Sequence, residues 1–325
     1  MRRRLWLALL ATALFGCNNN GETIPEEPEP TEDASVTEDG PATPTDGPIA
    51  GREKPRDRGS GTVTPSKWIP LATGTFQMGS PANELCRDAD EDQHEVKLTH
   101  KIEIAETEVT QKQFESLMGY NPSFHTTCGA TCPVEFVSWH EAVAYCNALS
   151  RAGGRPECYS CTGSGPHAAC AVAQTFAGEN GIYGCPGYRL PTEAEWEHAA
   201  RAGTTTAFYV GGISSCMSTD GNAGKIAWYK VNSTGLAHPV AGKTANAWGL
   251  FDMAGSVYEW VNDWYAASLG SGSVTDPAGP ANGTARVFRG GAYYFNAEHA
   301  RSANRLSFSP TKRFTFLGFR CVRSL

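Results

Sequence analysis

The sequence RLPTEAEWE, at residues 189–197, decides how the central part of this chain folds. Thr192 is followed three residues later by Glu195, which is the spacing of a capping box that satisfies free backbone N–H groups at a helix start. We therefore predict a helix that follows Pro191 and ends before Gly203. Its three glutamates are interpreted as structural rather than catalytic, because carboxylates in a first turn complement the helix dipole.

Two further capping boxes predict two further helices, and the rest of the chain reads as loops with short strands. The boxes begin at Thr110 and at Ser138, and the second helix should end near Gly153. The 35 glycines and 20 prolines separate short apolar pieces, of which 74–80 and 286–289 are typical strands. The sequence thus predicts an α+β fold with three main helices, short strands and little regular secondary structure.

The first 17 residues have the features of a bacterial lipoprotein signal peptide. Three arginines precede a short apolar run at 5–15, and a small residue stands just before Cys17. We expect lipidation of Cys17, which would anchor an exported protein in the cell envelope, facing either the periplasm or the surface. An ordinary signal peptide with an incidental Cys17 is the alternative.

Composition divides the remaining chain into two parts. Residues 18–64 are rich in proline, acidic residues and threonine and contain almost no large apolar residue, so we interpret them as a disordered tether. Residues 65–325 hold most of the aromatic residues and should form one domain. The formal net charge of -7 and the lack of a basic face give no reason to expect a nucleic-acid partner.

The cysteines are those of an exported protein. Eleven are present, and removal of Cys17 leaves an even number, which favours disulfides. The insertion at 153–187 has too little apolar content to hold itself, so local disulfides are expected among its four cysteines. Within it, Cys158 and Cys161 also have the spacing of a redox pair or half a zinc site, and that alternative stays open.

Several separated motifs of the chain resemble, in order, those of the formylglycine-generating enzyme, or sulfatase-modifying factor, family. They are GTFQMG at 74–79, EVTQKQF at 108–114, PVEFVSWHEA at 133–142, RLPTEAEWE at 189–197, NAWGLFDMAG at 246–255, EW at 259–260, RGG at 289–291 and GFR at 318–320. The resemblance implies a variant of the C-type-lectin-like α+β fold. It also implies a disulfide between Cys146 and Cys321.

One element of the family pattern is missing. Members that oxidise a sulfatase cysteine to formylglycine carry a copper-binding cysteine pair between the RGG and GFR motifs, and this chain has no cysteine between Gly291 and Leu317. We therefore predict a membrane-anchored, non-oxidising binding or accessory module and do not expect copper. The alternative is a formylglycine-generating oxidoreductase whose thiols come from elsewhere, such as the insertion. An iron-dependent sulfoxide synthase would need a further helical domain, for which the tether leaves no room.

Family position also suggests which residues bind. The cleft residues would be Tyr293, Phe295, Asn296, Arg301 and Arg305. Aromatic rings and guanidinium groups can hold peptide carbonyls, carboxylates or sugars, so a protein, peptide or glycan ligand is expected. For each of these residues the alternative is a place in the core or in a structural ion pair.

The loop from Asp252 to Glu259 is the expected metal site. The resemblance implies a calcium ion held by the side chains of Asp252 and Glu259 and by the backbone carbonyls of Gly255 and Val257. Hard cations such as calcium take six to eight oxygen ligands, which carboxylates and carbonyls supply. A second family calcium site near Asn222 stays unassigned, because no suitable acid lies in residues 229–235.

Overall fold

The computed structural model describes residues 67–177 and 181–325. The expected signal peptide, the lipidation site at Cys17 and the tether lie outside these residues. Within them we find no helix that is both long and apolar enough to cross a bilayer.

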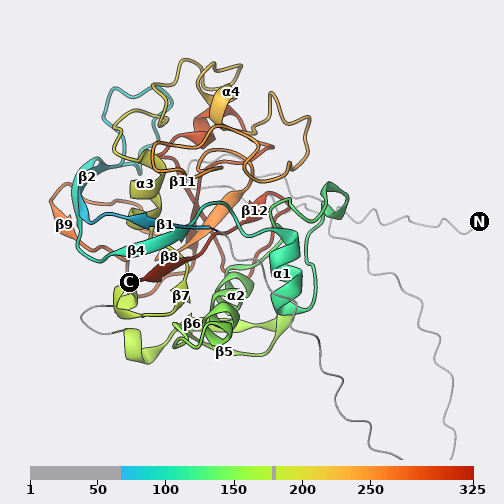
Figure 1. The fold of residues 1–325 in the computed structure, drawn as a ribbon. Coiled ribbons are helices and arrows are strands. Elements are labelled where there is room, and N and C mark those ends of the chain that lie inside the picture. The colour runs from blue at the N-terminus through green and yellow to red at the C-terminus, as the bar shows by residue number, and fades with distance from the viewer. Residues whose placement is uncertain (1–66, 178–180) are drawn as a thin grey trace, which may run out of the picture.

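Short strands form three small sheets and one hairpin. The first sheet has the order β1 (Trp68–Leu71), β4 (Ile102–Ala105), β13 (Val322–Ser324) and β7 (Tyr188–Arg189). The second has the order β11 (Arg305–Phe308), β10 (Arg286–Arg289), β8 (Tyr258–Trp264) and β12 (Leu317–Gly318). The third joins β2 (Gly74–Met78), β3 (His94–Leu98) and β9 (Val274–Thr275), and the hairpin joins β5 (Tyr159–Thr162) to β6 (Ala169–Val172). In the first sheet the last strand lies between β4 and β7, so both ends of the domain meet there (Figure 1).

The three predicted helices are present with their capping boxes. They are α1 (Gln111–Met118), α2 (Trp139–Ala152) and α3 (Glu193–Arg201), capped by Thr110, Ser138 and Thr192 respectively. A fourth helix, α4 (Ala223–Ile226), was not predicted, because it is a single turn without a side-chain cap. Short 3₁₀ turns complete the list: η1 (Thr126–Cys128), η2 (Gly165–His167), η3 (Gln174–Phe176), η4 (Gly181–Gly184) and η5 (Ala297–Ala300).

Two tryptophans join α2 to the second sheet. The Nε1 of Trp139 donates to the carbonyl of Val261 at 2.9 Å, and the Nε1 of Trp260 donates to the carbonyl of Val137 at 3.0 Å. Both rings are fully buried in the main core. Figure 1 shows α1, α2 and the β5–β6 hairpin at one end of the domain, and α4 with long loops at the other.

Four disulfides fasten the loops. Within the insertion Cys158 bonds Cys185 and Cys161 bonds Cys170, so the expected local disulfides are present. Cys158 and Cys161 thus have different partners and do not act as one pair. The other two disulfides are Cys86–Cys216 and Cys128–Cys132.

Cys146 and Cys321 lie side by side in the core as free thiols, with 3.0 Å between their sulfur atoms. Burial raises the pKa of the Cys146 thiol well above its usual value, so it is not a reactive thiolate. The expected disulfide between these two residues stays a prediction.

Buried arginines form the most extensive polar structure of the fold. Arg189 pairs both oxygens of Glu195 at 2.7 Å, and Arg320 pairs both oxygens of Glu259 at 2.7 Å. Arg289 bonds Glu197, which also accepts from Arg201. These side chains are almost completely shielded from solvent. Glu195 and Glu197 of the RLPTEAEWE motif thus take part in buried ion pairs, and their lack of a catalytic role stays a prediction.

The Cys146–Cys321 prediction can be tested on protein exported in an oxidising compartment. We expect a disulfide-linked peptide pair containing these residues in a non-reducing digest read by mass spectrometry. The Cys158–Cys185 pair serves as the internal control. Alkylation of both Cys146 and Cys321 in urea without reductant would contradict the bond.

The arginine network predicts a strong asymmetry between two charge-removing substitutions. Glu197→Gln leaves Arg289 and Arg201 underpaired in the core, so we expect the free energy of unfolding to fall by about 3–5 kcal/mol. Glu157→Gln removes the partner of Arg151 in an exposed ion pair, in which the charged atoms lie 2.9 Å apart. It should lower the free energy of unfolding by less than about 1 kcal/mol. Urea unfolding of both variants measures the difference, and equal effects would refute the role given to the network.

Candidate functional site

Two glycines bring residues 292–300 to the place where the family carries its cysteine pair. Gly290 and Gly291 follow β10 with φ of 101° and 74°, a conformation that favours glycine. A Cβ on Gly291 would lie 2.7 Å from the carbonyl oxygen of His299. The RGG motif therefore lets the chain turn back closely against η5.

The predicted aromatic residues of this segment lie at different depths. Tyr293 is buried, and its hydroxyl lies 2.7 Å from Nε2 of His125 and 3.3 Å from the hydroxyl of Thr315. Phe295 is half-buried, with its ring 4.9 Å from that of Phe316 and 5.0 Å from that of His299. Tyr293 thus packs in the interior beneath the segment, while Phe295 and Asn296 are partly exposed at its surface.

The two predicted cleft arginines lie elsewhere. The guanidinium of Arg301 is fully buried and bonds both oxygens of Glu91 at 2.7 Å. Arg305 is equally buried and bonds both oxygens of Glu193 at 2.7 Å. We therefore remove both from the candidate cleft, because their hydrogen-bonding groups are used within the fold.

Exposed apolar side chains gather around the segment. Eight large apolar side chains are exposed in the described part of the chain. Six of them lie in segment 293–298 or near residues that are linked to this segment by a contact, a hydrogen bond or a disulfide. We call these six the apolar rim: Leu85, Phe124, Met217, Val231, Leu236 and Tyr294. Scattered apolar residues are normal on a surface, but six of the eight exposed here are associated with one segment.

Hydrogen bonds tie the rim to the segment. The N–H of Lys230, next to Val231, donates to the carbonyl of Phe295 at 2.8 Å. The hydroxyl of Ser233 donates to the carbonyl of Tyr293 at 2.7 Å and holds the turn that carries Leu236. The Cys86–Cys216 disulfide joins the neighbours of Leu85 and Met217.

That disulfide also lies against η5. The N–H of Glu298 faces the carbonyl of Cys216 at 3.4 Å, and the Glu298 carboxylate and both sulfurs lie within 4.8 Å of one another. In the described ranges no other set of three His, Cys, Asp or Glu side chains is close enough to share an ion. Sequence reasoning missed this pair, because the two cysteines are 130 residues apart and lie outside the motifs.

The loop at 252–259 is tightly folded. Asp252, Gly255 and Ser256 all have positive φ, and a Cβ on Gly255 would lie 2.3 Å from the carbonyl oxygen of Trp228. The Oδ2 of Asp252 accepts the N–H of Ala241 at 2.6 Å. The motif therefore needs its glycine to bring this loop against the 228 segment.

Carboxyl groups outnumber cations behind this loop. Glu259 pairs with Arg320 and also accepts from Nε1 of Trp196 at 2.9 Å. Glu108 is fully buried, and no donor group of the described residues reaches either of its oxygens. The charge of the neighbouring Asp252 carboxylate acts on it. Burial, and then the charge of Asp252, raises the pKa of Glu108 well above its usual value.

Carboxyl groups outnumber cations here, although the side chains of Glu108, Asp252 and Glu259 are not close enough together to share an ion as they stand. Arg320 is the cation that acts on Glu108, Asp252 and Glu259 alike, and one guanidinium cannot balance three carboxylates. Glu108 was not among the predicted ligands, although it stands in the EVTQKQF motif. Its buried, donorless oxygens are the structural sign of a missing positive partner.

Comparison with known proteins identifies the family. Residues 55–325 match the family model described as "Sulfatase-modifying factor enzyme 1-like domain". The chain belongs to this family. Its C-type-lectin-like α+β fold is thereby confirmed.

The relatives carry different functions. The formylglycine-generating enzyme of Streptomyces coelicolor is 31% identical, over 78% of this chain and 88% of the enzyme. The chaperone protein LppX of Paenibacillus barcinonensis is 30% identical, over 68% of this chain and 79% of LppX. The serine/threonine-protein kinase pkn1 of Chlamydia caviae is 36% identical, but the match covers 47% of this chain and only 24% of the kinase. The solved structure of Treponema denticola variable protein 1 superposes with a TM-score of 0.64 and 33% identity, over 79% of this chain and 95% of that one.

Proposed function

We propose that this chain is an exported, membrane-anchored binding or accessory module that holds a polypeptide at the apolar rim and does not oxidise it. The observation that carries the proposal is that six exposed apolar side chains belong to residues 293–298 or adjoin residues linked to that segment by hydrogen bonds or the Cys86–Cys216 disulfide. Such a surface gains free energy when a partner covers it. The half-buried Phe295 at its centre offers an aromatic face for that partner.

The state of the cysteines supports a function without oxidation. Cysteine catalysis and copper binding both need an accessible thiolate. In the described residues, eight cysteines are in disulfides and the two free thiols, Cys146 and Cys321, are buried. Segment 292–300 itself contains no cysteine.

The names of the relatives point both ways. LppX is named a chaperone, which agrees with an accessory role, whereas the Streptomyces coelicolor relative is named a formylglycine-generating enzyme. The rim favours the first. Lipidation at Cys17 would place the domain at a membrane on a tether of residues 18–64.

Oxidation is the second candidate function, and one observation favours it. The Cys86–Cys216 disulfide lies against η5, beside the position of the family's cysteine pair. Once reduced by a dithiol, these two sulfurs would provide thiolates at the rim. The insertion is a weaker source of thiols than the sequence suggested, because Cys158 and Cys185 are fully buried.

We also propose that a calcium ion binds at the 252–259 loop. Asp252 and Glu259 would supply carboxylate oxygens, Gly255 and Val257 would supply carbonyls, and the buried carboxylate of Glu108 would add negative charge. The excess of carboxylates over Arg320 supports this proposal. Bound calcium would supply positive charge that lets these carboxylates stay ionised in the core.

The proposed function can be tested with a peptide that bears the sulfatase-type Cys-x-Pro-x-Arg motif. We expect the mass of the peptide to stay unchanged when it is incubated with copper and the purified protein, both before and after treatment of the protein with a dithiol. Formylglycine formed by the wild type and not by Cys86→Ser would establish the second candidate instead. Formylglycine formed by both would refute the non-oxidising role.

The rim itself is tested by panning a peptide library on the immobilised protein. The triple substitution Phe124→Ser, Leu236→Ser and Tyr294→Ser should weaken selected peptides at least tenfold, because it removes the apolar surface they cover. Leu325→Ser changes an exposed apolar residue outside the rim and should have no effect. Peptides that bind the triple variant as well as the wild type would exclude the rim.

The calcium proposal predicts a melting temperature that depends on the ion. Calcium at 100 times its dissociation constant would add about 2.7 kcal/mol to the free energy of unfolding, and a chelator should remove this gain. Glu108→Gln should reduce the calcium-dependent rise without lowering the melting temperature in chelator, because it removes a buried carboxyl that has no donor. Glu157→Gln is the matched control. A melting temperature that is the same with calcium and with chelator would contradict the site.

A further inference from the structure

Two sulfur atoms and a carboxylate meet beside the apolar rim. Cys86 lies in the loop between β2 and β3, Cys216 lies in the loop between α3 and α4, and Glu298 lies in η5. A carboxylate oxygen of Glu298 and the two sulfur atoms are within 4.8 Å of one another. Three segments that are far apart in the sequence therefore bring sulfur and oxygen ligands to one point.

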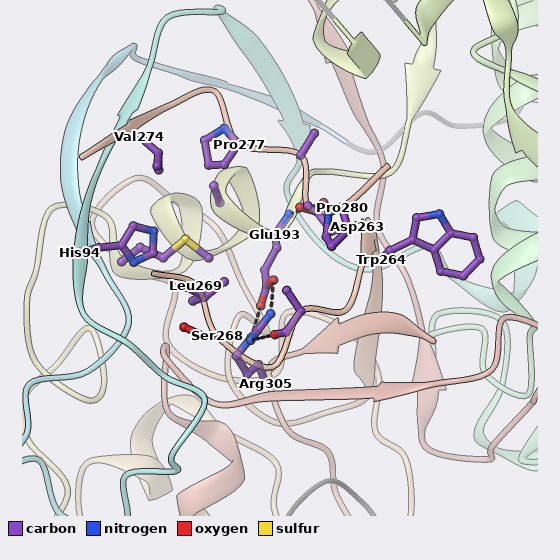
Figure 2. A pocket seen from close by; sticks show the side chains of 15 residues that line it. His94, Glu193, Asp263, Trp264, Ser268, Leu269, Val274, Pro277, Pro280 and Arg305 are labelled. Atoms are coloured by element: carbon purple, nitrogen blue, oxygen red, sulfur yellow. Dashed lines mark hydrogen bonds and ion pairs between the residues drawn. The ribbon is translucent and has the colours of Figure 1, made fainter. Parts of the chain in front are cut away.

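This convergence distinguishes the three residues from those around the cavity in Figure 2, which has a volume of about 320 Å³ and is lined in part by the end of β8. His94, Glu193 and Asp263 all line that cavity. They are not close enough to one another to share an ion, and Glu193 is paired with Arg305, as the dashed lines mark. The cavity therefore offers no comparable set of ligands.

The Cys86–Cys216 disulfide is accessible from solvent. Among the disulfides of the described residues, it is the one in which neither cysteine is buried, and each of the other three contains a buried cysteine. Thiol–disulfide exchange requires an attacking thiolate to reach a sulfur atom. A dithiol should therefore open this bond more readily than the fully buried Cys158–Cys185 bond.

Arg301 fixes the loop of Cys86 against η5. Its buried guanidinium donates to the carboxylate of Glu84, two residues before Cys86, and to the carbonyl of Glu298, each at 3.0 Å. Cys86 itself has a φ of 65°, which few residues other than glycine adopt. Such a conformation persists where the surroundings hold it. These contacts do not involve the sulfur atoms, so they hold the loop when the disulfide is open.

The loop of Cys216 is fixed in the same way. The N–H and the hydroxyl of Ser214 both donate to Oδ2 of Asp220 at 2.7 Å. The carbonyl of Cys216 also faces the N–H of Glu298 at 3.4 Å. Both thiols of the reduced protein therefore stay beside the carboxylate, and ligands held in place in this way lose little freedom when they bind.

We propose that Cys86, Cys216 and Glu298 bind a zinc ion once a dithiol has reduced the disulfide. The dithiol is oxidised to its cyclic disulfide, and its two electrons and two protons convert the protein disulfide into two thiols. Zn²⁺ then displaces the two thiol protons and bonds two thiolates and one carboxylate. Zinc accepts this mixture of sulfur and oxygen ligands at about 2.0–2.3 Å. Small side-chain rotations bring the three ligand atoms to these distances.

The zinc ion and the disulfide are alternative links between the same two loops. Leu85 and Met217 of the apolar rim are the neighbours of the two cysteines, so either link holds them. Three protein ligands leave one position of a tetrahedral zinc ion for water. The site is independent of the function proposed for the rim. It also differs from a copper centre for cysteine oxidation, because zinc does not change its oxidation state.

Reduction of the full chain by increasing concentrations of dithiothreitol tests whether the disulfide opens. Free thiols are alkylated, and the digest is read by mass spectrometry. We expect alkylation of Cys86 and Cys216 at a concentration that leaves Cys158 and Cys185 joined. Opening of Cys158–Cys185 at the same or a lower concentration would overturn the proposal.

Zinc binding is then measured on protein reduced at that concentration and freed of the reagent without air. Titration against a chromophoric chelator, in buffer that contains calcium, should give one zinc ion per reduced chain and none per oxidised chain. Cobalt in place of zinc should show the absorption of thiolate ligands. Equal binding by the two forms, or no binding by the reduced form, would refute the site.

Variants locate the ion. Cys216→Ser should abolish zinc binding by the reduced protein, and Glu298→Gln should weaken it roughly tenfold, because each removes a ligand. Glu157→Gln and the double variant Cys161→Ser, Cys170→Ser change a carboxylate and a disulfide elsewhere and should bind as the wild type does. Glu298→Gln keeps the disulfide, so it decides the matter even where Cys216→Ser fails to fold. Wild-type affinity in Glu298→Gln, or loss of binding in either control, would refute the assignment of the ligands.

Discussion

Pairing of buried arginines with carboxylates is the constraint on which this fold depends. Arg189, Arg289, Arg301, Arg305 and Arg320 are among its largest fully buried side chains. A buried charge that loses its partner costs roughly 3–5 kcal/mol, so each arginine requires its carboxylate. The partners come from different motifs: RGG pairs with RLPTEAEWE, and GFR pairs with Glu259 of the EW motif. This explains physically why such widely separated motifs occur together in one chain.

The same ion pairs hold both ends of segment 292–300 without using the side chains of that segment. Arg289 before the segment 292–300 bonds Glu197, and Arg301 after it bonds Glu91 and Glu84. Both ends of the segment are therefore held by ion pairs that do not involve the residues between them. Positions within the segment can exchange cysteines for other residues while the fold persists. The absence of cysteines from the segment therefore removes none of these ion pairs.

Features that depend on residues close in sequence could be predicted, whereas those that join distant residues could not. The three capping boxes predicted α1, α2 and α3 because a cap is a contact between residues three apart. The insertion's disulfides followed from cysteines close in sequence. By contrast, the Cys86–Cys216 bond spans 130 residues, and nothing near either cysteine marks its partner. Arg301 and Arg305 were expected in the cleft because a sequence does not distinguish a buried guanidinium from an exposed one; their partners, Glu91 and Glu193, lie more than 100 residues away.

The proposed calcium ion follows from the same rule of charge balance. Arg320 neutralises Glu259, and this leaves Glu108 and Asp252 as a carboxyl pair in the core with no cation of their own. The neighbouring backbone ties this pair to the C-terminal part of the chain, because the N–H of Val109 donates to the carbonyl of Phe319 at 2.9 Å. A cation here would therefore join the EVTQKQF motif, the 252–259 loop and the GFR motif. Its role would be that of a further structural ion pair, which stabilises β8 and β12 and takes no part in the chemistry of the rim.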